Sequence, residues 1–239
     1  MPAPRLSSWP PGILNVWMHD AMWVASRHAQ LTQAYPDRFL LGLGVSHAVL
    51  VDNAEDGHRY ARPLSAMIGY LDLLDAAAPP VPTSERALAA LGPKMLELAR
   101  DRALGAHPYL VTTDHTAHAR EILGPGPLLA PELKVVLSTD ATEARSISRQ
   151  GLALYLTLPN YTDNLQRIGF TAADLANGGS DRLVDSIVAW GDLDAIAHRI
   201  RQHREAGADH VCLQVLTAND SAFPLAQWRE LASMLPAIS

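Results

Sequence analysis

The chain has 239 residues, of which 48% are hydrophobic and 18% charged, so it is long enough for one large α/β domain with a sizeable core. Its net charge of −6 excludes a nucleic-acid partner, because no stripe rich in Lys and Arg is available to neutralise phosphates. One cysteine excludes an intramolecular disulfide. The first residues lack the apolar core of a signal peptide, and no apolar run approaches the roughly 20 residues that cross a bilayer, so we expect a cytoplasmic protein without a membrane partner.

Strand-like and helix-like segments alternate along the chain, which predicts βα units and a parallel sheet. Asp20 and Thr139 or Asp140 precede helical patterns as N-caps, and Pro63 suits a first helical turn. The predicted strands cover residues 12–17, 39–45, 87–91, 109–111, 135–138 and 211–216. The predicted helices cover residues 21–34, 63–74, 93–102, 116–123 and 224–234, and the whole stretch 141–206 shows only helical pattern.

Six predicted strands leave the architecture open. A closed (β/α) barrel needs eight strands. The residues alone are consistent with an open, doubly wound sheet, or with a barrel whose first two βα units are missing.

The strand over 39–45 is the most informative segment. Gly42 and Gly44 remove side chains from one of its faces, which lets another backbone or a flat ligand come close. Ser46 and His47 follow at its carboxyl end, where parallel α/β folds place their ligand chemistry.

Gly92 and Pro93 open a helix directly after a predicted strand. The free N–H groups and partial positive charge of such a helix start can bind an anion. An ordinary strand–helix turn without a ligand explains the same residues. His107, Asp114, His115 and His118 suggest a metal site, with the last two imidazoles three residues apart at a helix start. No third ligand with zinc-like spacing accompanies these two imidazoles, so we expect no metal site.

Six segments, in order, resemble the F420-dependent branch of the luciferase-like monooxygenase superfamily. They are Gly12-Ile13-Leu14-Asn15-Val16-Trp17, residues 38–47, residues 62–71, Leu91-Gly92-Pro93-Lys94-Met95-Leu96-Glu97-Leu98-Ala99, His107-Pro108-Tyr109-Leu110-Val111-Thr112 and residues 205–211. The resemblance implies one domain over 1–239 with a (β/α)8 TIM-barrel fold, lacking the first two βα units and carrying a helical insertion at about 141–190.

The resemblance also implies a function: hydride transfer between coenzyme F420 and a small organic substrate. It implies a cytoplasmic homodimer in which His47 moves a proton on the substrate. It implies cofactor-binding positions at Asn15, Gly44, Val45, Ser46, Leu91, Gly92, Lys94 and Met95.

Two alternatives stay open. The first is an FMN-dependent monooxygenase on the same fold. The second is a truncated, non-catalytic paralogue that acts as a binding or assembly module.

Overall fold

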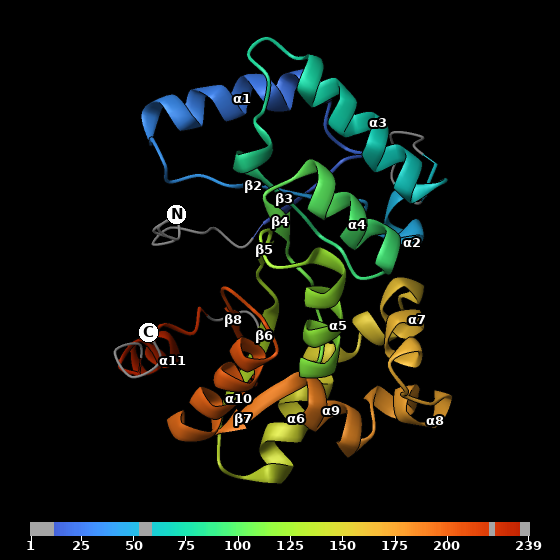
Figure 1. Cartoon of the computed structure of the whole chain (residues 1–239). Coiled ribbons are helices and arrows are strands. Elements are labelled where there is room, and N and C mark those ends of the chain that lie inside the picture. Colours follow the sequence, from blue (N-terminus) through green and yellow to red (C-terminus); the bar gives the residue numbers. More distant parts are fainter. Residues whose placement is uncertain (1–11, 53–58, 220–222, 235–239) are drawn as a thin grey trace. The chain divides into compact units, whose positions relative to one another are not determined.

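The computed structural model describes residues 12–52, 59–219 and 223–234. The chain divides into two compact units (Figure 1), the first comprising Met1–His107 with Ile122–Pro127 and the second Pro108–Glu121 with Leu128–Ser239. Each unit is α/β with a parallel sheet, as the alternating pattern predicts. Among the described residues, no helix combines the length and the apolar composition that crossing a membrane requires.

The first unit contains a parallel sheet in the order β1-β2-β3-β4. Its strands are β1 (Ile13–Asn15), β2 (Leu41–Gly44), β3 (Arg86–Leu88) and β4 (Gly105–Ala106). Its helices are α1 (Ala21–Ala34), the one-turn α2 (Ala48–Val51), α3 (Pro63–Ala76) and α4 (Pro93–Arg102), with a 3₁₀ turn at Thr83–Glu85. Buried Leu43 and Leu88 lie in register on one face of the sheet, whereas Gly42 and Ala87 pair on the other.

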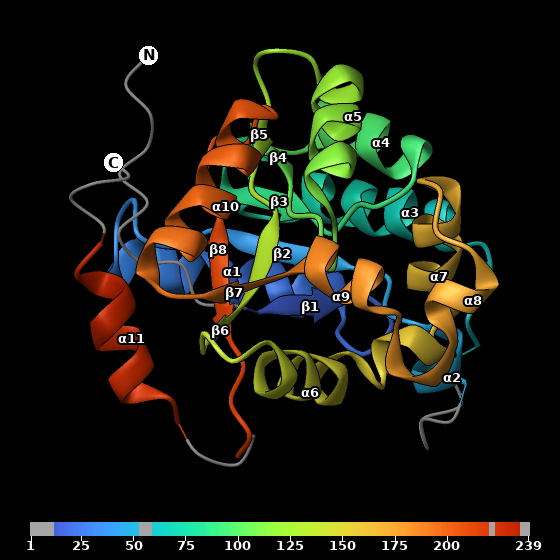
Figure 2. The same ribbon diagram turned by 90° about the horizontal axis from the view of Figure 1, so that it is seen from below.

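The second unit has a three-stranded parallel sheet in the order β7-β6-β8. The strands of this sheet are β6 (Glu132–Leu137), β7 (Val188–Gly191) and β8 (Cys212–Val215), and the unit also contains β5 (Leu128–Leu129), which lies outside this sheet. Its helices are α5 (Thr113–Leu123), α6 (Ala141–Leu152), α7 (Pro159–Arg167), α8 (Ala172–Leu175), α9 (Asp181–Ile187), α10 (Leu193–Glu205) and α11 (Leu225–Ala232), with 3₁₀ turns at Tyr155–Thr157 and Ala176–Gly178. Figure 2 shows α6, α9 and α10 around the strands of this unit.

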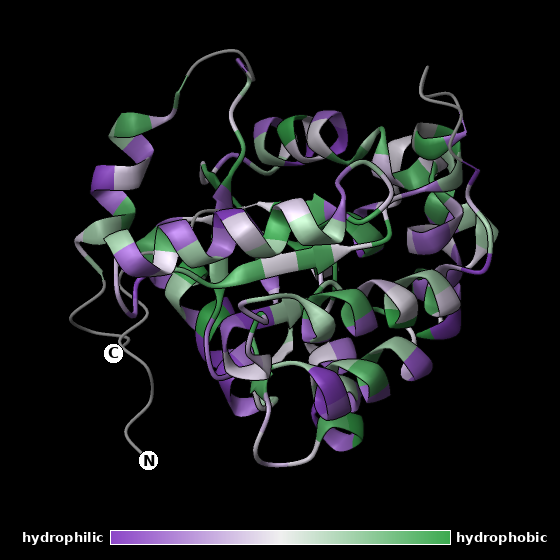
Figure 3. Ribbon diagram, turned by 90° about the horizontal axis from the view of Figure 1, so that it is seen from above, coloured by the Kyte–Doolittle hydropathy of each residue, from purple (hydrophilic) through white to green (hydrophobic). Residues whose placement is uncertain are grey.

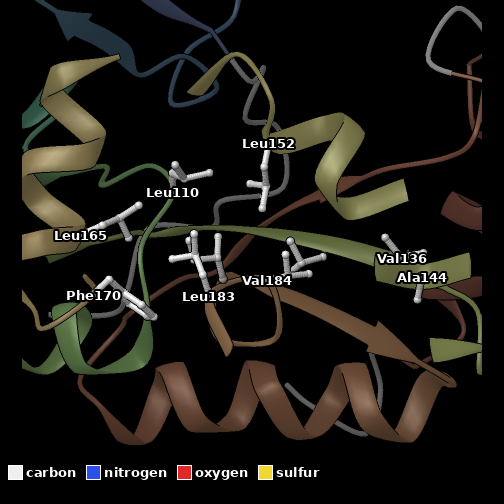
Figure 4. Packing of buried hydrophobic residues seen from close by; sticks show 10 residues of the cluster. Leu110, Val136, Ala144, Leu152, Leu165, Phe170, Leu183 and Val184 are labelled. Atoms are coloured by element: carbon white, nitrogen blue, oxygen red, sulfur yellow. The ribbon is translucent and has the colours of Figure 1, made fainter. Parts of the chain in front are cut away.

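Two apolar clusters hold the second unit together, because β6 presents alternate residues to opposite faces. Leu133 and Val135 face Ile196 and Ile200 of α10. Val136 belongs to the other cluster, in which side chains from α6, α7 and α9 converge (Figure 4). Most helices carry hydrophobic and hydrophilic residues side by side, whereas the strands are largely hydrophobic (Figure 3).

The predicted N-caps Asp20 and Asp140 are confirmed, since capping depends only on neighbouring residues. The carboxylate of Asp20 accepts a hydrogen bond from the backbone N–H of Trp23 (2.9 Å). Asp140 accepts from the N–H groups of Thr142 and Glu143 in the same way.

The strand predicted over 109–111 is wrong, and the strand of this region is β4 at Gly105–Ala106. Leu110 has a φ of +58°, a left-handed conformation that an extended strand cannot contain. Its N–H donates instead to the buried carboxylate of Glu132 (3.2 Å). The apolar run is therefore buried as a bend.

The purely helical reading of 141–206 is also wrong, because β7 lies inside it. Its four residues follow α9 without a break and pair with β6 from Lys134↔Val188 to Leu137↔Gly191. A short apolar run at the end of a helical pattern does not reveal its own secondary structure. Other boundaries also move: β3 ends at Leu88, α5 begins at Thr113, and β5 was not predicted.

His203 of α10 should make the stability of the second unit depend on pH. Its side chain is fully buried, and Nδ1 lies 2.9 Å from Oγ1 of Thr116, whose hydroxyl is placed to donate to the Thr112 carbonyl. Burial, aided by Arg199 and His115, lowers the pKa of His203 from 6.5 to about 4. The unfolded chain therefore takes up a proton here at a higher pH than the folded chain does.

We expect the free energy of unfolding to fall by about 3 kcal/mol through this residue as the pH drops from 6.5 to 4, because the unfolded state binds more protons in that window. Urea titrations at pH 7 and pH 4.5 measure the difference. His203→Gln should flatten the pH dependence, whereas His198→Gln, at an exposed position of the same helix, should leave it unchanged. Equal pH dependence in both variants would contradict the assignment.

Candidate functional site

The candidate site is built where three parallel strands of the first unit end. Asn15 is the last residue of β1 and pairs with Gly44, the last residue of β2. β3 pairs with β2 in the same direction, and the chain after it reaches Gly92 and α4. Because parallel strands end at one edge of a sheet, the predicted cofactor-binding segments and His47 all come to the same edge.

Hydrogen bonds tie the end of β1 to the end of β2. Oδ1 of Asn15 accepts from the backbone N–H of Trp17 (3.0 Å), which holds the turn after the strand. Nε1 of Trp17 donates to the carbonyl oxygen of Val45 (2.8 Å), and the N–H of Val16 donates to that of Gly44 (3.1 Å). The carbonyls of Gly44 and Val45 therefore already have partners within the unit.

The two glycines of β2 are required by the neighbouring strand. A Cβ on Gly42 would lie 2.7 Å from Cδ1 of Ile13 and 2.9 Å from the carbonyl oxygen of Gly12. A Cβ on Gly44 would lie 2.5 Å from Cγ2 of Ile13. The expected close approach is confirmed, and it is made by β1. The sequence does not predict that Ile13 packs against Gly42 and Gly44, because this contact depends on the register between β1 and β2.

Ser46 and His47 form a strained turn at the end of β2. Ser46 has a φ of +57°, a conformation that costs a non-glycine residue about 1–2 kcal/mol. The turn makes His47 the residue that precedes α2, with an extended φ of −133°. Burial lowers the pKa of His47 below 6.5, so its half-buried imidazole is neutral at pH 7 and can accept a proton.

The start of α4 can receive an anion. Gly92 is its N-cap without a side-chain cap, and open space surrounds the position that a Cβ would take. The N–H groups of Met95 and Leu96 both donate to the Gly92 carbonyl (3.1 Å each), and Pro93 has no N–H. The N–H of Lys94 is therefore the first-turn donor left for a ligand, below an exposed lysine side chain.

The residues present fit the anionic tail of a flat cofactor at the start of α4. They do not leave room for its ring on the face of β2 that lacks side chains. The open, uncapped start of α4 suits the tail. The face of β2 that lacks side chains is filled by Ile13, so a ring would lie at the strand ends beside Ser46 and His47.

The comparisons with known proteins agree with this architecture. The sequence model described as luciferase-like monooxygenase matches residues 10–210. No curated protein matches the chain significantly. Solved structures similar over nearly the whole chain include the three described next, at identities that show the fold alone.

An F420-dependent secondary alcohol dehydrogenase in complex with an F420–acetone adduct is 14% identical, covering 95% of this chain and 78% of its own, with a TM-score of 0.71. The coenzyme F420-dependent tetrahydromethanopterin reductase of Methanopyrus kandleri is 14% identical, covering 96% and 82%, with a TM-score of 0.67. The oxygenating constituent of 3,6-diketocamphane monooxygenase from Pseudomonas putida, in complex with FMN, is 12% identical, covering 93% and 76%, with a TM-score of 0.63.

The family model spans most of the chain, and the parallel α/β units agree with the fold of these enzymes. The chain therefore belongs to the luciferase-like monooxygenase family.

Proposed function

We propose that the protein is an F420-dependent oxidoreductase that transfers a hydride between the deazaflavin and a small organic substrate. The observation that carries the proposal is the meeting of Ser46, His47 and the uncapped start of α4 at one edge of the sheet. When bound, the deazaflavin supplies the carbon that accepts or donates the hydride.

The residues of this chain supply position and proton transfer. Gly92 and the N–H of Lys94 hold the anionic tail, with Leu91 and Met95 beside it. Asn15, Gly44, Val45 and Ser46 border the ring. The neutral imidazole of His47 takes the proton from a substrate hydroxyl during oxidation and returns it during reduction.

An FMN-dependent monooxygenase is the second candidate. It is favoured by the similarity to a monooxygenase solved with FMN. FMN and F420 both carry a phosphate group on the ribityl chain, so the start of α4 suits either cofactor. The glycine-rich strand followed by Ser46 and His47 resembles the F420-dependent branch and favours the deazaflavin.

Titrations of the purified full chain with F420 and with FMN distinguish the two candidates. We expect saturable binding of F420 and binding of FMN at least tenfold weaker. Binding of FMN alone would establish the monooxygenase reading. Binding of neither cofactor would contradict both and would favour a non-catalytic binding or assembly module.

A Gly92→Asp variant tests the tail site without disturbing the fold. Gly92 has an ordinary φ of −87° and open space around it, and aspartate is a preferred N-cap, so α4 should not be destabilised. Its carboxylate would compete for the N–H of Lys94 and repel the tail, so we expect affinity to drop about tenfold or more. Gly92→Asn has nearly the same shape without the charge and is the matched control. An affinity equal to that of the parent protein in both variants would place the tail elsewhere.

A further inference from the structure

A second candidate site lies wholly within the second unit and is independent of the cofactor site. It is a cavity of about 380 Å³ lined by the start of α5, by the chain between α7 and α8, and by α9 and α10. Its lining includes Arg199, Arg182, Thr113 and Gln202. Polar groups dominate this lining, which distinguishes the cavity from a gap in the apolar core.

Arg199 places a fixed positive charge on the cavity wall. Its Nη1 donates to the carbonyl oxygen of Ser186 and its Nη2 to that of Asp185, both at 2.9 Å, which orients the guanidinium plane. Carbonyl oxygens carry only partial charge, and within the described chain no carboxylate forms an ion pair with this guanidinium. Burial lowers the pKa of Arg199, and the nearby carboxylate of Asp185 opposes that shift without forming an ion pair with the guanidinium.

Both carboxylate oxygens of the neighbouring Asp185 accept hydrogen bonds from other side chains. Its Oδ2 accepts from Nη2 of Arg145 (2.6 Å), and its Oδ1 accepts from Nε1 of Trp190 (2.8 Å). Arg182 at the cavity is similarly engaged, because its Nη1 pairs with Asp174 (2.9 Å) and its guanidinium lies over the ring of Phe170 (4.6 Å). Arg199 therefore keeps the unbalanced charge.

Further hydrogen-bond donors line the same cavity. The hydroxyl of Thr113 and the side-chain amide of Gln202 form no hydrogen bond with another side chain or backbone group of the described residues, and both line the cavity. Thr112 caps α5 by accepting from the N–H of His115 (3.2 Å), so the N–H groups of Thr113 and Asp114 belong to the open first turn. Asp114, an exposed residue, also lines the cavity, and its carboxylate opposes an anion there.

We propose that this cavity binds a small oxyanion, the phosphate or carboxylate group of a metabolite, through the guanidinium of Arg199 with Thr113, Gln202 and the first turn of α5. Arginine carries its N–H donors in a planar fork that matches the oxygens of both anions. The Nε–H and the second hydrogens of Nη1 and Nη2 remain for the ligand after the two carbonyl contacts.

Calorimetric titration of the full chain with inorganic phosphate, and separately with acetate, tests the proposal. The Gly92→Asp background removes the start of α4 as a competing anion site, so a failure here does not coincide with a failure of the proposed cofactor site. We expect saturable binding of one anion per chain with a Kd on the order of millimolar or tighter. Stronger binding of phosphate would identify a phosphorylated metabolite, and stronger binding of acetate a carboxylic acid.

Arg199→Gln should weaken binding about tenfold or more, as loss of a charge-assisted contact does. Arg201→Gln makes the same charge change at an exposed position of α10 and should change the Kd less than about twofold. Because Arg199 also holds two carbonyls of α9, Gln202→Leu serves as a second variant that leaves those bonds intact, and it should weaken binding about threefold or more. Absence of saturable binding in the parent protein, or equal affinities in the Arg199, Gln202 and Arg201 variants, would overturn the proposal.

Discussion

Replacing His47 with alanine is expected to lower kcat by about 100- to 10 000-fold while the Kd for F420 changes less than about threefold. The imidazole is half-buried at the end of β2, and burial holds its pKa below 6.5. It is thus unprotonated at pH 7, as a group that takes a proton from a substrate hydroxyl must be. Removing it leaves the tail site at α4 intact, which is why binding and turnover should separate.

Turnover of F420 with a panel of small alcohols is the appropriate first assay, because the proposed role of His47 requires a substrate hydroxyl that gives up a proton. The pH profile provides an independent check. For oxidation, kcat/KM should fall as the pH drops through the pKa of His47, which lies below 6.5, because protonation removes the base.

The control for this experiment is His19→Ala, which removes an exposed histidine of the same unit. His19 stacks on the ring of Trp23, with centroids 5.9 Å apart, and has no place in the proposed site. A His47→Ala enzyme with full turnover, or a loss shared equally with the His19 variant, would remove the proposed proton role.

The features that sequence analysis predicts well are those that depend on neighbouring residues. Asp20 and Asp140 cap their helices because the cap and the groups it binds are a few residues apart. The turn at Gly92 is equally local. The carboxyl ends of β1, β2 and β3 could be placed together because parallel sheets bring strand ends to one edge.

The features that sequence analysis misses depend on register and distant contacts. The first half of β6 was not predicted because it contains Glu132 and Lys134, and charged residues are not expected inside a buried strand. Ile13 fills the space beside Gly44 only because β1 and β2 pair in one register. Arg199 looks like any arginine on an amphipathic helix until the carbonyls of α9 fix its direction.

The same buried charges on β6 are the basis of the largest stability effect that we expect. Glu132 and Lys134 are two residues apart, so both point to one face of the strand. Nζ of Lys134 lies 2.9 Å from Oε1 of Glu132, 2.7 Å from the hydroxyl of Tyr109 and 3.2 Å from Oε1 of Gln214. All three hydrogens of the ammonium group thus have acceptors, although the side chain is fully buried.

Lys134→Met is expected to destabilise the second unit by about 3–5 kcal/mol, because it leaves the carboxylate of Glu132 buried without its cation. Burial alone lowers the pKa of Lys134, and Glu132 opposes that shift, so each charge is tolerated chiefly because of the other. A Glu132→Gln/Lys134→Met double variant should recover most of the loss. Glutamine is neutral and still offers the N–H of Leu110 an acceptor.

The labelling of Cys212 measures how often this unit opens. Cys212 is the one cysteine of the chain, and it lies opposite Glu132 in the register of β6 and β8. Cys212 is partly buried, and burial together with the charge of Glu132 raises the pKa of its thiol to about 12, so a thiol reagent labels the folded chain slowly and the opened unit faster. The labelling rate at pH 8 should rise in Lys134→Met and return toward the parent rate in the double variant. Lys94→Met, at an exposed lysine of the other unit, should label at the parent rate. If the double variant opens as readily as Lys134→Met, the cost lies in the lost contacts of the ammonium group with Tyr109 and Gln214, and the uncompensated carboxylate is not its cause.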